Sequence, residues 1–155
     1  MNTSINNIFN ENFYNTSSIE LASTNLDYHP NISQINLNAI NLIKSYESLQ
    51  ENWDSYGAET PSVIAMQKAV TFILWLSKYN IDAFFVAPSP NGNIVVEIKQ
   101  NNANVEFEFT QDSDDNICAS QNENFISEAI LNDTTKISYI KWLICPNGDC
   151  PPSFR

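Results

Sequence analysis

Positively charged residues are scarce in this chain. Among 155 residues only 7 are Lys or Arg, against 18 Asp or Glu, and the formal net charge is −11. Proteins that bind a nucleic-acid backbone neutralise its phosphates with lysine and arginine. The composition therefore argues against direct nucleic-acid binding, and for the same electrostatic reason against an anionic membrane surface.

Histidine and glycine are also rare, which limits the catalytic chemistry. The single histidine, His29, is the one possible base for a Ser–His or Cys–His relay, and no G-x-S-x-G elbow is present. The three glycines lie far apart and form no phosphate-cradling loop. We therefore predict no catalytic residue and no cofactor, and we expect that the protein is not an enzyme.

Long hydrophobic runs are missing as well. No stretch reaches the roughly 18 consecutive apolar residues that mark a membrane-spanning helix. The N-terminus has no basic segment followed by an apolar core, so we expect no secretion signal and a cytoplasmic location. The length suits one domain. We predict a loosely packed or partner-ordered arm at residues 1–34, a single domain at 35–145 and a C-terminal tail at 146–155.

Hydrophobic periodicity predicts the helices. Apolar residues recur at steps of three and four from Ile35 to Gln50, which indicates a first helix. A second helix is expected to open at Thr60-Pro61 and to run to about Tyr79. Its apolar residues cover most of its circumference, so it should be the central, buried helix. A short last helix is expected from Asp133.

Between the second and last helices the pattern changes to strands separated by turns. Asn91-Gly92 is a strong hairpin signal, and apolar residues alternate with polar ones on both sides of the turn at Asn101-Asn102. The expected strands cover residues 83–87, 94–99, 105–110, 117–121 and 125–131. The sequence therefore predicts an α+β fold. Two N-terminal helices and a short C-terminal helix should pack on one face of a four- to five-stranded antiparallel meander.

The segment between the first two helices, residues 52–62, is predicted to be a structural hinge. The rings of Trp53 and Tyr56 are expected to lock one helix against the next. Gly57 can end the first helix in a left-handed conformation. Asp54 should bond to local backbone, and its spacing from Glu59 has nothing specific to a catalytic pair of carboxylates.

The hinge sequence N-W-D-S-Y-G-A-x-x-P-S resembles a scattered group of small, uncharacterised bacterial proteins. Their recurring pattern is N-W-D-G-Y-G-A followed by a proline-started helix and a P-x-P-x-G hairpin, which Pro88, Pro90 and Gly92 match. Ser55 stands where the group usually has glycine. The resemblance covers roughly residues 37–144. It implies a fold but no activity, and proteins of this kind look like accessory products of bacterial or mobile-element gene neighbourhoods.

Acidic residues are concentrated between Glu97 and Asp133, where Lys99 is the only opposing charge. Strand alternation places a set of glutamates on the wet face of the sheet, and aspartates follow in the next turn. The predicted partner-binding residues are Glu97, Glu106, Glu108, Asp112, Asp114 and Asp115. The aspartates lack the glycine of a calcium loop, so no metal site is predicted there.

We expect a non-enzymatic interaction protein that binds a basic protein partner through this face. An antitoxin, an immunity protein, an inhibitor of a nucleic-acid enzyme or a nucleic-acid mimic would fit. A solvated acidic surface without a partner is the simpler alternative.

A functional alternative rests on the cysteines. Cys145 and Cys150 flank a short turn, and Cys118 lies on a predicted strand. The pair could form a disulfide, or half of a metal site completed by Cys118 and His29. A small thiol-redox or metal-binding protein is therefore the alternative function. No C-x₂-C repeat is present, and a cytoplasmic location favours reduced thiols.

Overall fold

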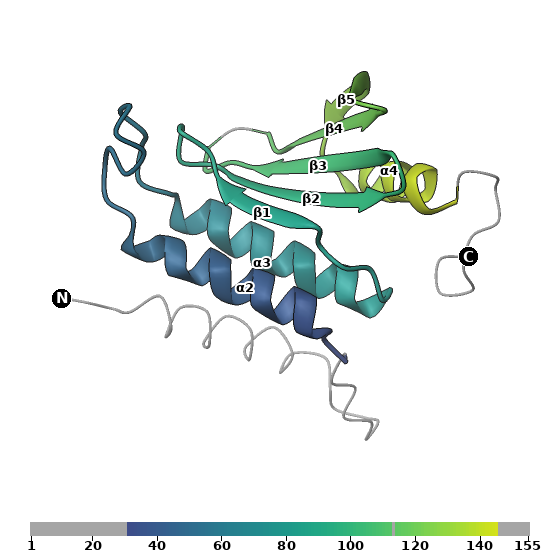
Figure 1. Cartoon of the computed structure of the whole chain (residues 1–155), viewed down its shortest axis with the longest axis horizontal. Helices are drawn as coiled ribbons and strands as arrows, with labels where there is room; N and C mark the ends of the chain where they lie inside the picture. The colour runs from purple at the N-terminus through teal and green to yellow at the C-terminus, as the bar shows by residue number, and fades with distance from the viewer. Residues whose placement is uncertain (1–30, 113, 146–155) are drawn as a thin grey trace.

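The computed structural model describes residues 31–112 and 114–145, and the chain in this part forms an α+β fold (Figure 1). The elements are α2 (Gln34–Ser45), the short 3₁₀ helix η1 (Tyr46–Ser48), α3 (Val63–Lys78), β1 (Phe85–Pro88), β2 (Ile94–Gln100), β3 (Ala103–Phe109), β4 (Asn116–Gln121), β5 (Asn124–Ile130) and α4 (Asp133–Ile144). The strands form one antiparallel sheet in the order β1-β2-β3-β4-β5. The predicted α+β meander is therefore confirmed, with all five strands present.

The core lies on one face of this sheet, because the buried positions of the three central strands alternate. The buried strand residues are Ile94, Val96, Ile98, Val105, Phe107, Phe109, Ile117 and Ala119. They share one hydrophobic cluster with Ile43 of α2, Leu76 of α3 and Ile140 of α4. The helices among the described residues thus pack on the same face, and the intervening strand positions form an opposite face that none of these helices covers.

Helix α3 is the central helix, as the sequence predicts. It contacts α2 on one side and β2 and β3 on the other, and Figure 1 shows α2 and α3 side by side beneath the sheet. The centroid of the Phe72 ring lies 4.4 Å from the centroid of the Phe107 ring. Burial of these large apolar side chains is the main stabilising term of such a core.

The start of α3 differs from the prediction. The N-cap is Ser62, whose hydroxyl accepts a hydrogen bond from the Ala65 amide at 3.3 Å, and the helix begins at Val63. Thr60-Pro61 was expected to fill these positions. The chain just before the helix is held elsewhere, because the Glu59 amide donates to the Pro90 carbonyl in the β1–β2 turn at 2.8 Å. The Ser62 amide also donates to the Gly92 carbonyl of this turn at 2.8 Å, and the helix begins at the next residue.

The end of α2 also differs, since Gly57 does not terminate it. The helix ends at Ser45 and tightens into η1, where the amide of Tyr46 donates to the carbonyls of Ile43 and Lys44. The buried Tyr46 hydroxyl donates to the Val86 carbonyl of β1 at 2.9 Å. This contact holds the end of the helix on the sheet edge, and Gly57 lies in the following loop at φ +94°.

The hinge loop is held by its own hydrogen bonds. The Asp54 carboxylate accepts from the amides of Tyr56 at 2.8 Å and Ala58 at 3.0 Å, which confirms the predicted local role. The Trp53 indole donates to the Glu59 carbonyl at 3.0 Å. Tyr56 is 94% exposed, so the prediction that its ring locks two helices together is wrong. The loop's side-chain and backbone bonds replace the expected ring packing.

The buried side-chain amide of Asn36, which the sequence analysis did not identify, links α2 to the rest of the fold. Asn36 donates from Nδ2 to the Ser77 hydroxyl and to the Ile81 carbonyl, both at 2.9 Å. Its Oδ1 accepts from the Ala83 amide at 2.8 Å. One side chain therefore joins α2, α3 and the segment that leads into β1.

The predicted arm and tail fall almost wholly outside the described residues. His29 lies in residues 1–30 and Cys150 in residues 146–155, so the structure says nothing about either position. Among the residues that are described, no helix is both long and apolar enough to cross a membrane.

Candidate functional site

One row of side chains crosses the whole uncovered face of the sheet. In register order it runs Phe85, Glu97, Glu106, Cys118 and Glu128, with one residue from each strand. Directly opposed residues of neighbouring strands point to the same face, so these side chains are neighbours. We call Glu97, Glu106, Cys118 and Glu128 the acidic row.

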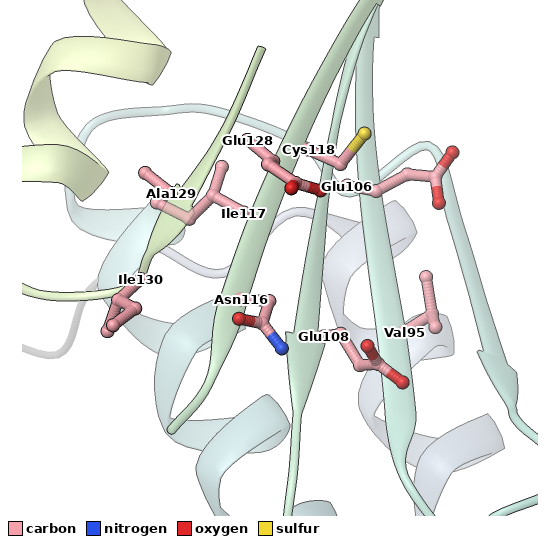
Figure 2. A pocket seen from close by; sticks show the side chains of 9 residues that line it. All are labelled: Val95, Glu106, Glu108, Asn116, Ile117, Cys118, Glu128, Ala129 and Ile130. Carbon is pink, nitrogen blue, oxygen red and sulfur yellow. The ribbon is translucent and has the colours of Figure 1, made fainter. Parts of the chain in front are cut away.

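A shallow hollow of about 580 Å³ lies along this face (Figure 2). Figure 2 shows Glu106, Cys118 and Glu128 together at one level and Glu108 with Asn116 at the next. The Glu108 carboxylate accepts a hydrogen bond from the Asn93 amide group at 2.8 Å. The hollow is therefore a surface lined mainly by acceptors and apolar groups.

Within the row, the pKa of Glu97 is perturbed by its surroundings. Partial burial raises the pKa of Glu97, and the charge of Glu106 directly opposite raises it further. Lys99 and a hydrogen bond from Asn104 act in the opposite direction but do not cancel the increase. The ionised form of Glu97 is thus disfavoured in the folded chain, as expected for like charges held close together.

The pKa of the Cys118 thiol is also affected by the charges of the row. Burial raises the pKa of Cys118, and the charges of Glu106 and Glu128 add to the increase. A raised pKa keeps the thiol protonated, and the thiolate is the form that attacks electrophiles and binds metals. The surroundings of Cys118 are therefore unsuited to a reactive cysteine.

The row has no salt-bridge partner within the described chain. The salt bridges there join Lys68 to Asp115 at 3.0 Å and Lys136 to Asp133 at 2.7 Å. Lys99 is the nearest cation in sequence, and its ammonium lies over the Phe84 ring, 5.0 Å from the centroid. No lysine or arginine occurs at all between residues 100 and 135. A concentrated negative field therefore faces solvent.

The structure places the predicted partner-binding residues in three different surroundings. Glu97, Glu106 and Glu108 share the uncovered face as expected, and Asp112 and Asp114 are exposed in the β3–β4 loop. The structure does not bring Asp115 to this face. Its carboxylate pairs with Lys68 and accepts from the Thr110 amide at 2.8 Å, so it fastens the loop to α3.

Glu128 belongs to the site, although the sequence analysis did not select it. The register places it directly opposite Cys118, but an irregularity between Ala119 and Ser120 interrupts simple alternation along β5. A bulge of this kind shifts the strand's side chains by one position. Sequence periodicity alone could not place Glu128 for this reason.

Of the residues of the alternative site, Cys118 and Cys145 lie among those that the structure describes. Cys118 is free and faces the hollow, whereas Cys145, just after α4, is buried and disulfide-bonded. Of the outcomes left open by the spacing, the disulfide holds for Cys145 and the expected reduced thiol does not. Within residues 31–112 and 114–145, no group of three His, Cys, Asp or Glu side chains could hold a metal ion.

A second hollow of about 630 Å³ lies between α3 and the start of α4. Trp75 lines it together with Lys68 and Lys136. Both lysines are already paired with aspartates, and Lys136 also lies 4.6 Å from the centre of the Trp75 ring. Both lysines therefore make contacts within the folded chain, and this hollow is a weaker candidate for a binding site than the uncovered sheet face.

Comparison with protein-family models, with curated proteins and with solved structures finds no match to this chain. No activity, ligand or partner is therefore suggested by a relative, and the chemistry of the uncovered face carries the functional conclusion.

Proposed function

We propose that this protein is a non-enzymatic module that binds a basic protein partner through the uncovered sheet face. The observation that carries the proposal is the acidic row, in which Glu97 and Glu106 oppose each other on β2 and β3 and Glu128 follows on β5, with no salt bridge to any of them among the described residues. Like charges directly opposed across strands destabilise a sheet. Lysine or arginine side chains from a partner would convert this repulsion into attraction.

The spacing of the row suits a protein partner better than a single ion. Adjacent strands lie about 4.8 Å apart, so Glu106 and Glu128, separated by β4, stand on backbones roughly 10 Å apart. A metal ion needs converging ligands within about 2.5 Å. Cations spread over a protein surface can meet carboxylates at these larger intervals, and such complementarity gives specificity and rapid association.

The class of partner follows from the same charge. Enzymes and binding proteins that act on nucleic acids present clustered lysine and arginine to phosphates. A row of carboxylates can occupy such a surface, so the proposed role is that of an inhibitor, antitoxin or immunity protein, in the cytoplasm. The disulfide at Cys145 is the feature that opposes this location, because disulfides are rare in that compartment.

The proposal is tested by capturing partners from cells of the source organism at low salt. Wild type is compared with E97Q/E106Q and with E47Q/E51Q, a control that removes the same charge from exposed positions outside the sheet. We expect one basic protein to be recovered with wild type and with the control, and to be lost with E97Q/E106Q or in high salt. Equal recovery with all three proteins would contradict the proposal.

A further inference from the structure

The two edges of the sheet are protected very differently. The β1 edge is short, ends at Pro88 and is contacted by α2. The β5 edge, Asn124–Ile130, contains neither proline nor lysine, and among the residues that the structure describes it pairs on one side only, with β4. Short strands, prolines and lysines are the usual devices that prevent an edge from pairing with another chain. Strand β5 lacks these three devices, although its pairing with β4 contains a register irregularity between Ala119 and Ser120.

Backbone groups on β5 face this open edge. The Leu131 amide donates to the Asp115 carbonyl at 2.7 Å, which fixes the phase of the antiparallel ladder with β4. In such a ladder the inward and outward directions alternate, so the N–H and C=O groups of Glu128 and Ile130 point outward. The Ile130 carbonyl already accepts from the Thr135 hydroxyl at 2.8 Å. Glu128 therefore offers the donor and acceptor pair that a new strand would meet.

The β5 side chains on the uncovered face alternate between apolar and acidic. Phe125 is opposite Ser120, Glu128 is opposite Cys118 and Ile130 is opposite Asn116, so the three β5 side chains share the uncovered face. Phe125 is 63% exposed and Ile130 is 54% exposed. Along this edge the face thus presents an apolar, an acidic and an apolar group in turn.

We propose, building on the proposed function, that the basic partner adds an extended segment to β5 as a further strand of the sheet. Its side chains on the uncovered face follow the pattern hydrophobic-x-Lys/Arg-x-hydrophobic. The cation stands opposite Glu128 at the end of the acidic row, and the flanking hydrophobic groups cover Phe125 and Ile130. Backbone bonds then supply affinity while the alternate side chains supply specificity, as in other cases of strand addition.

The negative charge of the chain favours a basic segment over a second copy of the same chain as the added strand. Two copies would bring Glu123 and Glu128 of each chain to one edge, and each chain carries a net charge of −11. The register irregularity at Ala119/Ser120 also bends the strand, which disfavours flat pairing of two identical edges. A basic segment carries no like charge, and only one of the two paired strands then has the irregularity.

The test uses the full chain and a defined probe, a synthetic peptide with isoleucine, arginine and isoleucine at alternate positions separated by threonines. Affinity is measured at low salt for wild type, E128Q and E128P. E128Q removes the charge and keeps the outward N–H. E128P also removes that N–H, and because it points away from β4 no ladder bond is lost. Circular dichroism checks that both variants are folded.

We expect E128Q to weaken peptide binding about twofold to fivefold, as for an exposed ion pair. E128P should weaken it by a further factor of about three to ten through the lost backbone hydrogen bond. A peptide with glutamate in place of arginine should not bind. Equal affinity of E128P and E128Q, with both folded, would overturn strand addition.

The result is separable from the proposed function. If E97Q/E106Q loses the natural partner while E128P retains it as well as E128Q does, the acidic face binds the partner but β5 does not pair with it. If E97Q/E106Q retains the partner, the proposed function itself fails.

Discussion

Glu97 and Glu106 face each other across β2 and β3 at a point where the ladder holds opposed side chains closest. The Glu97 carbonyl accepts from the Phe84 amide on the β1 side at 2.7 Å, so it is turned away from β3. The two glutamates therefore form a non-hydrogen-bonded pair, whose Cα atoms stand about 4.5 Å apart in such ladders. Two carboxylates in this position cost stability until a cation joins them.

The first prediction concerns the stability of E97Q. At neutral pH the variant should be more stable than wild type by about 0.2–1 kcal/mol, the range for a cross-strand pair. The folded-state pKa of Glu97 is raised, so its carboxyl supports folding while protonated and loses this contribution as pH rises through that pKa. The advantage of E97Q should therefore disappear as pH falls below the ordinary value of 4.5. Denaturant unfolding across this range checks the sign.

The second prediction uses the thiol in the row as a probe of its field. Because burial, and to a smaller extent the charges of Glu106 and Glu128, raise the pKa of Cys118, its reaction with iodoacetamide at mildly alkaline pH should be slower than that of an unstructured cysteine peptide. E106Q/E128Q should react faster than wild type, and E47Q/E51Q should not differ from it. Mass spectrometry identifies the alkylated residue. If Cys118 were alkylated at the same rate in E106Q/E128Q as in wild type, the two glutamates would not affect the pKa of the thiol.

The third prediction tests the buried amide. N36A removes the bonds to Ser77, Ile81 and Ala83 and leaves buried groups without partners. We expect a loss of about 2–4 kcal/mol in the free energy of unfolding. The exposed Asn38 on the same helix provides a control, since N38A should change stability by less than about 0.5 kcal/mol. Similar effects of the two changes would contradict the assigned role of Asn36.

The fourth prediction concerns the hinge. Ser55 has φ +67°, a conformation that is strained for a residue with a side chain. S55G should therefore stabilise the protein by about 0.5–1 kcal/mol, whereas S55A should give no such gain. Thermal unfolding compares the variants.

The sequence predicted the layers of the fold better than its boundaries. Alternation in β2 and β3 and the apolar circumference of α3 were sufficient to place the core on one face. The N-cap was placed at Thr60 instead of Ser62 because the contact between Glu59 and Pro90 is tertiary and leaves no local signal. Tyr56 illustrates the same limit, since its exposure follows from hydrogen bonds inside the loop.

The sequence predicted only part of the candidate site, because the rest depends on contacts between distant residues. Periodicity identifies the glutamates that alternate with core residues, Glu97, Glu106 and Glu108. Whether an acidic side chain is already paired depends on residues distant in sequence, as Lys68 shows for Asp115. Glu128 required the strand register, which the bulge conceals.

Carboxyl footprinting of the protein with and without its captured partner tests the electrostatic surface most directly. Carbodiimide-driven labelling of Glu97, Glu106 and Glu128 should fall several-fold in the complex, while labelling of Glu47 and Glu51 should stay unchanged. If the row is labelled equally in both states and protection falls on other carboxylates, the partner binds elsewhere and the uncovered face is not the interface.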